Sequence, residues 1–211
     1  MKKMLILIGP QGAGNHLWSK IFSLHTDVFG WKTLLTNYWE AHRIAEPFAK
    51  CWKNHDLLKE FDWDQKDYYF TSISCPLGIV NSTVNPIWNP DVDGFAKTVE
   101  SCGIQVEFAI IGRDQTILKY QQTRIRTQPT LPLFLDTLSN INTTTFLSYE
   151  LLYLYKQNYL KSLKFNIPIA WDHKQIDEIL EDDANIKYIH SINYSELDNG
   201  NKLGITFKRK P

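Results

Sequence analysis

The first 24 residues constrain the fold most, because they join an apolar run, a glycine-rich turn and an amphipathic segment without interruption. Residues 4–8 (MLILI) are all apolar, which is typical of a strand buried on both faces of a sheet. The turn at 9–16 (GPQGAGNH) holds three glycines, and Leu17, Ile21 and Phe22 after it are spaced for one helical face. These residues predict a strand, a loop and a helix, in that order.

The same alternation continues along the chain. Runs rich in apolar, aromatic and β-branched residues predict further strands at 66–74, 105–111, 143–149 and 186–191. Helical patterns and their end signals predict helices at 37–60, 90–102, 115–125, 150–165 and 173–182, with a short apolar segment at 131–139 and a loop at 77–89. Asn89 before Pro90 predicts one helix start, and Gly103 predicts the end of that helix.

This order of elements predicts an α/β fold with three layers, α/β/α, around a central, mainly parallel sheet with right-handed crossovers. A length of 211 residues suits one domain. We therefore expect a single domain over 1–211, with a mainly helical insertion around residues 30–65. In such sheets ligands bind beyond the carboxyl ends of the strands.

Composition excludes several classes of protein. The chain is 43% hydrophobic and 13% aromatic, which excludes a disordered chain. Its 23 Lys and Arg balance 23 Asp and Glu, so nucleic-acid binding is not expected. No run approaches the roughly 20 apolar residues that cross a bilayer. We expect a cytoplasmic protein without a membrane partner.

The cysteines and histidines do not form a recognisable metal or disulfide pattern. Cys51, Cys75 and Cys102 are scattered and form no CxxC pair, which favours a reducing compartment. The six histidines have no metal-ligand spacing, so no metal site is predicted.

The turn at 9–16 has the length and glycine spacing of the phosphate-binding pattern GxxxxGK[ST]. Asn15 stands where that pattern has lysine, and His16 where it has serine or threonine. A glycine loop still lets backbone N–H groups face a phosphate at a helix N-terminus. The alternative is an ordinary tight turn between a strand and a helix. The residues that we expect to contact a phosphate are Gly9, Gly12, Ala13, Gly14, Asn15 and His16.

A second candidate site follows the third expected strand, where Arg113 and Asp114 precede a helix. An arginine at this end of a parallel strand lies on the ligand-binding edge of the sheet. Its planar guanidinium matches a pair of phosphate oxygens. In the alternative interpretation these two residues make local ion pairs, and Lys119, Arg124 and Arg126 form a solvated helix face.

The two sites in this order resemble the sulfotransferases that use 3′-phosphoadenosine 5′-phosphosulfate. In addition, residues 148–152 (SYELL) are similar to that family's Tyr-Glu-Asp-Leu strand end. The likeness spans roughly residues 4–165 and rests on order and spacing. It implies a P-loop nucleotide-hydrolase-like fold, in which the first loop holds the 5′-phosphosulfate and Arg113 holds the 3′-phosphate.

The family's side chains carry over in part. Arg113 matches the arginine of the 3′-phosphate, and the serine expected eight positions later falls on Gln121, whose amide also donates hydrogen bonds. The loop lysine falls on Gly12. Protonated His16, Arg124 and Arg126 are the candidates to replace its charge.

This chain also differs from the family at other side chains of the site, including the catalytic histidine. The loop's two threonines fall on Asn15 and His16, and the family's catalytic histidine falls near Ser74. A serine does not act as a general base unaided, and His16 is the nearest titratable substitute. Loss of one charge-stabilising donor typically costs on the order of 10²-fold in rate, so the resemblance implies a slow or inactive enzyme.

The resemblance implies that a sulfuryl group moves from 3′-phosphoadenosine 5′-phosphosulfate to a hydroxyl or amine acceptor, without a metal. Two alternatives remain at this stage. One is a nucleotide or nucleoside kinase, in which Arg124 and Arg126 would be lid arginines that clamp the transferring phosphate. The other is a non-catalytic nucleotide-binding module, which the missing lysine and histidine favour. The acceptor, the oligomeric state and the biological context are not readable from the sequence.

Overall fold

All five strands of the sheet run parallel in the computed structural model, which describes residues 1–79, 81–126, 128–138, 141, 144–181 and 183–189. Their spatial order is β2-β3-β1-β4-β5. The strands are β1 (Lys3–Gly9), β2 (Val28–Phe29), β3 (Tyr68–Ser74), β4 (Gln105–Gly112) and β5 (Thr144–Ser148). The α/β class and the parallel sheet predicted from the sequence are therefore confirmed.

Helices cover both faces of the sheet, because alternate side chains of β1 enter two separate cores. Met4, Ile6 and Ile8 lie in one core, and Leu5 and Leu7 lie in the other. The first core includes side chains of α3 (Val92–Ser101) and α5 (Leu131–Leu138). The second includes side chains of α1 (Asn15–Ser23), α6 (Tyr149–Ser162) and α7 (Gln175–Ile179).

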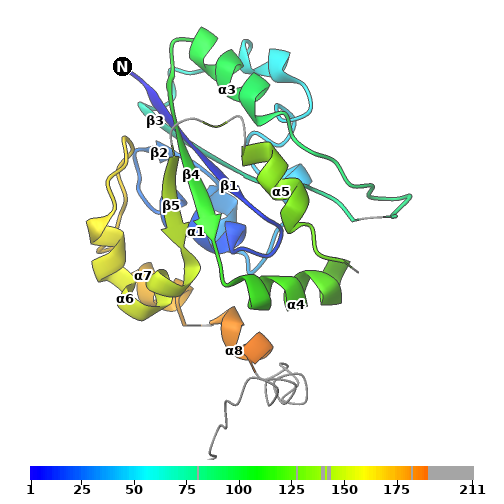
Figure 1. The fold of residues 1–211 in the computed structure, drawn as a ribbon. Coiled ribbons are helices and arrows are strands. Elements are labelled where there is room, and N and C mark those ends of the chain that lie inside the picture. Colours follow the sequence, from blue (N-terminus) through cyan, green and yellow to red (C-terminus); the bar gives the residue numbers. More distant parts are fainter. Residues whose placement is uncertain (80, 127, 139–140, 142–143, 182, 190–211) are drawn as a thin grey trace, which may run out of the picture.

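The strand register brings the expected site residues to one edge. Gly9 at the end of β1 pairs with Ser74 at the end of β3, and Ile8 pairs with Ile110 near the end of β4. Two further helices, α4 (Gln115–Arg126) and α8 (Ala184–Ile189), contact each other and lie beyond these carboxyl ends (Figure 1).

The strand expected at 186–191 is wrong. Residues 184–189 form α8, and residues 190–191 lie outside the described residues. Asp183 stabilises the helix start, since its Oδ1 accepts a hydrogen bond from the N–H of Asn185 at 2.8 Å. The apolar run was too short for its period to distinguish a strand from a helix.

The continuous helix expected at 37–60 is also wrong. The region holds two four-residue pieces, α2 (His42–Ala45) and η2 (His55–Leu58), and a third, η1 (Lys32–Leu35), lies just before it. Glu46 has extended dihedral angles (φ −64°, ψ 133°), as expected for a residue that precedes a proline. Pro47 therefore explains why α2 ends so early.

The helix expected after Asn89 begins two residues later than predicted. Asp91 is the N-cap of α3, and its side chain accepts a hydrogen bond from the N–H of Gly94 at 2.9 Å. Gly103 has a φ of +79°, which agrees with its predicted role at the helix end.

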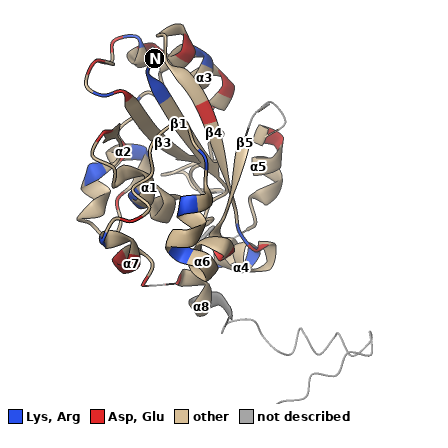
Figure 2. Ribbon diagram, turned by 90° about the vertical axis from the view of Figure 1, so that its left-hand side faces the viewer, with Lys and Arg blue, Asp and Glu red and all other residues tan. Residues whose placement is uncertain are grey.

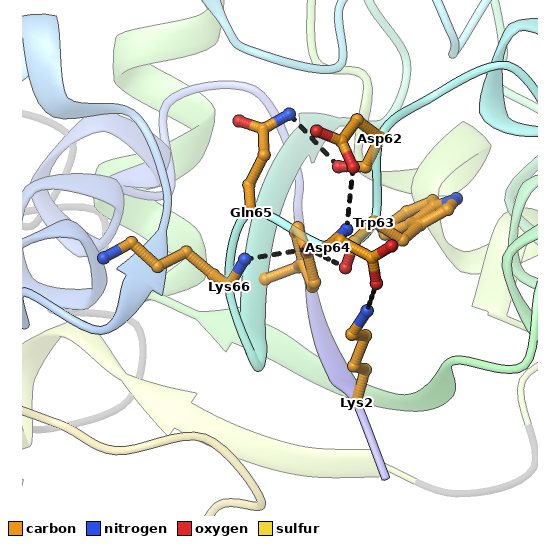
Figure 3. A network of polar contacts seen from close by, with 7 residues as sticks. Lys2, Asp62, Trp63, Asp64, Gln65 and Lys66 are labelled. Atoms are coloured by element: carbon orange, nitrogen blue, oxygen red, sulfur yellow. Dashed lines mark hydrogen bonds and ion pairs between the residues drawn. The ribbon is translucent and has the colours of Figure 1, made fainter.

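The amino end of the sheet is held by a network of polar contacts near the surface (Figure 3). Lys2 Nζ pairs with Asp64, whose side chain is 91% exposed. The Tyr69 hydroxyl donates to the carbonyl of Trp63 and accepts from the N–H of Lys66 at 3.2 Å. These contacts attach the turn before β3 to the start of β1.

Charges of both signs are interspersed over the described helices and loops (Figure 2). This distribution agrees with the zero formal net charge. Within the described residues, no helix has the length and apolar character needed to span a membrane.

Candidate functional site

The loop between β1 and α1 turns sharply at two glycines. Gly12 has a φ of +84° and Gly14 a φ of +105°, in the left-handed region that favours glycine. Gly14 is the N-cap of α1, and the first intrahelical bond runs from the Trp18 N–H to the Gly14 carbonyl at 3.0 Å. The N–H groups of the first helical turn have no acceptor within the helix, which makes this end suitable for an anion.

Side chains from α4 and α6 pack closely on both glycines. A Cβ atom added to Gly12 would lie 2.9 Å from Cδ of Gln121, and one added to Gly14 would lie 2.8 Å from Cδ2 of Tyr149. Glycine is thus required here by close packing as well as by the backbone angle.

Arg113 lies against this loop, as the sequence led us to expect. It follows the carboxyl end of β4, and its side chain is buried. Nη1 donates to the carbonyl of Gly12 and, at 2.6 Å, to Oε1 of Gln121. The structure therefore brings Gly12, Arg113 and Gln121 together from three segments of the chain.

The remaining edge and the flat face of the guanidinium also contact protein groups. Nε and Nη2 donate to Oδ1 of Asn185 at 2.9 and 2.5 Å. The guanidinium carbon lies 4.4 Å from the centroid of the Tyr149 ring, a cation–π distance. Burial raises the pKa of Tyr149, so its ring stays neutral beside the cation.

Asn15, in the place of the loop lysine, points into the protein. Its Nδ2 donates to Oγ of Ser74 and, at 3.5 Å, makes a long contact with the carbonyl of Gly9. The structure thus joins two of the expected site residues, Asn15 and Ser74. Oδ1 of Asn15 is buried and has no hydrogen-bond partner among the described residues.

His16 lies in a different cluster. Its Nε2 is 2.7 Å from the carbonyl oxygen of Glu40, so Nε2 carries the proton. Its ring stacks on Trp39 at 5.9 Å and lies at 5.1 Å from the His42 ring, between centroids. Burial lowers the pKa of His16, which favours a neutral imidazole over the cation that would replace a lysine.

Two buried titratable groups behind His16 were not expected to matter. Nε2 of His42 is 2.8 Å from the carbonyl and from Oγ of Ser72, and burial lowers the pKa of His42 to about 3. Glu46 accepts hydrogen bonds at 2.8 Å from the Thr71 hydroxyl and the Phe48 N–H. Burial raises the pKa of Glu46 to about 8. An isolated His and Glu gave no signal in the sequence.

A chain of amides, also missed from the sequence, holds the loop to α4. Nε2 of Gln122 donates to the carbonyl of Gln11 at 2.7 Å, and Oε1 of Gln122 accepts from the N–H of Thr130 at 2.7 Å. Nε2 of Gln11 donates to the carbonyl of Gly78 at 2.7 Å. Gln121 and Gln122 are neighbours, so both amides that reach the loop come from one turn of α4.

The last two expected site residues differ in exposure. Ala13 is fully buried in the core beneath the loop, so it packs there and does not present a group to a ligand. The Ala13 N–H donates to the carbonyl of Pro10 at 3.1 Å. Arg124 is exposed on α4, three residues after Gln121.

Two pockets lined by described residues lie away from this loop. One of about 350 Å³ is lined by residues including Trp52, His55 and Trp88, and one of about 270 Å³ by residues including Asp64 and Lys66. The described residues contain no group of three His, Cys, Asp or Glu side chains that could hold a metal ion. We base the candidate site on the loop and Arg113, because polar groups from separate strands converge there.

No protein-family model, curated protein or solved structure matches the chain. The interpretation of this site therefore rests on its own geometry.

Proposed function

We propose that the protein binds a doubly phosphorylated adenosine nucleotide at the loop after β1 and acts as a sulfotransferase-like protein. The donor would be 3′-phosphoadenosine 5′-phosphosulfate. The observation that carries the proposal is the contact between Arg113 and Gly12, which brings a guanidinium from the end of β4 to a glycine loop at a helix N-terminus. The guanidinium and the N-terminal end of the helix can each bind one phosphate group.

The loop and Arg113 have different tasks in this proposal. The first-turn N–H groups of α1 bind the 5′-phosphosulfate, and the guanidinium of Arg113 binds the 3′-phosphate. In the transfer step the S–O bond to the nucleotide breaks and a new bond forms between sulfur and the acceptor oxygen or nitrogen. The nucleotide phosphate leaves with the bonding electrons, and the acceptor loses a proton.

The candidate for accepting that proton is His16. The lowered pKa of its ring favours the neutral form, and Nε2 already carries a proton, so Nδ1 is the basic nitrogen. Ser74 would contribute hydrogen bonding rather than basicity, because its Oγ is held by the Asn15 amide. Asn15 has no charge to offer the leaving phosphate, so turnover is expected to be slow.

A non-catalytic nucleotide-binding module is the second candidate. It is favoured by Asn15, whose amide is engaged with Ser74 and Gly9 rather than directed toward a ligand. This candidate shares the nucleotide site and differs in the absence of turnover. A kinase is less well supported, because a neutral amide stands where a phosphate-binding lysine is needed.

Calorimetric titration of the full chain tests the binding part of the proposal. Adenosine 3′,5′-bisphosphate is expected to bind more tightly than ATP with Mg²⁺, since only the former carries a 3′-phosphate for Arg113. The variant Arg113→Met should lose this preference, whereas Lys164→Ala, at an exposed lysine outside the site, should keep it. Equal affinity for both nucleotides, or binding to neither, would reject the proposal.

Release of adenosine 3′,5′-bisphosphate from 3′-phosphoadenosine 5′-phosphosulfate, measured with a panel of hydroxyl and amine acceptors, separates the two candidates. Turnover that is lost in His16→Ala favours the enzyme. Binding without turnover favours the module.

A further inference from the structure

Asn185 covers the edge of Arg113 that suits a phosphate. Nε and Nη2 lie on the same side of the guanidinium, and both donate to the single oxygen Oδ1 of Asn185, at 2.9 and 2.5 Å. Two parallel N–H groups are the arrangement that binds two phosphate oxygens in a bidentate manner. One neutral amide oxygen thus takes the position where such an anion would bind.

The rest of Arg113 is held in place independently of α8. Nη1 contacts Gly12 and Gln121, and the flat face of the guanidinium lies on Tyr149. Displacement of Asn185 would therefore release Nε and Nη2 from its Oδ1 while the loop, α4 and α6 keep the guanidinium oriented. Because the guanidinium keeps its orientation, the edge that Asn185 covers is a preformed anion subsite.

Asp183, directly before the helix that carries Asn185, helps to attach it. Asp183 Oδ1 accepts from the Asn185 N–H at 2.8 Å and from the Tyr149 hydroxyl at 3.3 Å. Asn185 is 6% exposed, whereas the next residue, Ile186, is 55% exposed. The side-chain amide of Asn185 thus faces Arg113, whereas the apolar side chain of Ile186 faces solvent.

We propose that α8 is a competitive cap on the anion subsite: Asn185 holds the Nε and Nη2 edge of Arg113, and a phosphate group binds by replacing it. The Asn185 contacts combine a charged donor with one neutral acceptor oxygen, whereas a phosphate group supplies charged acceptors and a separate oxygen for each N–H. A phosphate oxyanion therefore outcompetes the amide oxygen, but its affinity is reduced by the cost of lifting the cap. The proposal rests on the proposed function only for the identity of the ligand, since any phosphate group could compete.

Two substitutions at Asn185 should change phosphate affinity in opposite directions. Asn185→Ala removes the competing oxygen, so pyrophosphate and adenosine 3′,5′-bisphosphate should bind about tenfold more tightly. Asn185→Asp has nearly the same shape but places a carboxylate on the guanidinium, so both should bind at least about tenfold more weakly. Ile186→Ala, on the exposed side of α8, is the matched control and should bind as the unmodified chain does.

A ligand-independent measurement separates the cap from the nucleotide assignment. An arginine-specific dicarbonyl reagent, followed by peptide mass spectrometry, measures access to Arg113, and the exposed Arg43 provides an internal reference. Modification of Arg113 should accelerate in Asn185→Ala and slow in Asn185→Asp, and inorganic phosphate should protect Arg113 in Asn185→Ala.

The outcomes are distinguishable. If phosphate protects Arg113 but adenosine 3′,5′-bisphosphate has no advantage over phosphate, the cap stands and the nucleotide assignment fails. If Asn185→Ala weakens anion binding, Asn185 belongs to the binding surface and the cap is refuted. Unchanged reactivity of Arg113 in both variants also refutes it.

Discussion

Each end of the sheet has a cation in a polar contact, but the two contacts differ in their exposure to solvent. At the carboxyl end, Arg113 is 8% exposed and donates to oxygens from three separate segments. At the amino end, Lys2 pairs with Asp64, which is almost fully exposed. Polar interactions are stronger where water is excluded and are screened at the surface. We infer that Arg113 holds three segments of the chain together at the carboxyl end, whereas the Lys2–Asp64 pair only supports the turn before β3.

The largest effect is expected from Arg113→Met, which keeps an apolar stem and removes the guanidinium. Oxygens of Gly12, Gln121 and Asn185 would lose charged donors, so the free energy of unfolding should fall by about 3 kcal/mol. Urea denaturation measures this change. If Lys2→Met lowered the free energy of unfolding as much, the inferred difference between the two ends would be wrong.

The buried groups that contact β3, Glu46 and His42, should also make stability depend on pH. The pKa of Glu46 is raised to about 8, so the folded chain retains a proton that the unfolded chain has lost, and stability falls as pH rises from 6.5 to 8. The expected loss over this interval is about 2 kcal/mol. Below pH 6.5, His42 opposes this trend, because its pKa is lowered to about 3 and the unfolded chain binds the proton first.

Glu46→Gln tests the source of this pH dependence. The amide cannot ionise, so denaturation curves at pH 6.5 and 8 should give nearly equal stability. Asp64→Asn, at the amino end, should leave the decline intact. A decline that persists in Glu46→Gln would assign it to another group.

A smaller effect is expected from the packing of the loop. Gly12→Ala and Gly103→Ala both place alanine at a positive φ, +84° and +79°, which costs roughly 1–2 kcal/mol in each case. Only the Cβ at position 12 would also meet Gln121, whereas the one at 103 has no atom within 4 Å. The difference in unfolding free energy between the two variants should be about 1 kcal/mol. Equal losses of stability in the two variants would mean that the Gln121 side chain on α4 moves away from the added Cβ without an energetic cost.

The smallest effect is expected at the amino end. Asp64→Asn removes one partner of an exposed pair and should leave the melting temperature within measurement error, because solvent screens such pairs. Any small change should vanish at high salt. A salt-resistant loss of stability would show that the two ends differ less than their exposure suggests.

The sequence predicted the convergence of the loop and Arg113 for a geometric reason. Both follow strands of a parallel sheet, and the carboxyl ends of such strands lie at one edge. It did not predict Asn185, which is 72 positions from Arg113 and directly precedes the segment 186–191 that was expected as a strand. Nor did it predict the contact of Gln122 with the loop, because the direction of an amide side chain depends on how α4 packs.

What the sequence determined by itself is the order of four strands, β1, β3, β4 and β5, the helices α1, α3, α4 and α6, and the place of the glycine loop, because local periodicity and backbone freedom are properties of neighbouring residues. Only the tertiary structure decided which groups meet. It turned Asn15 toward Ser74, enclosed His16 among aromatic rings and placed Asn185 on Arg113. Contacts between distant segments depend on packing and on the exclusion of water, and a linear pattern of residues specifies neither.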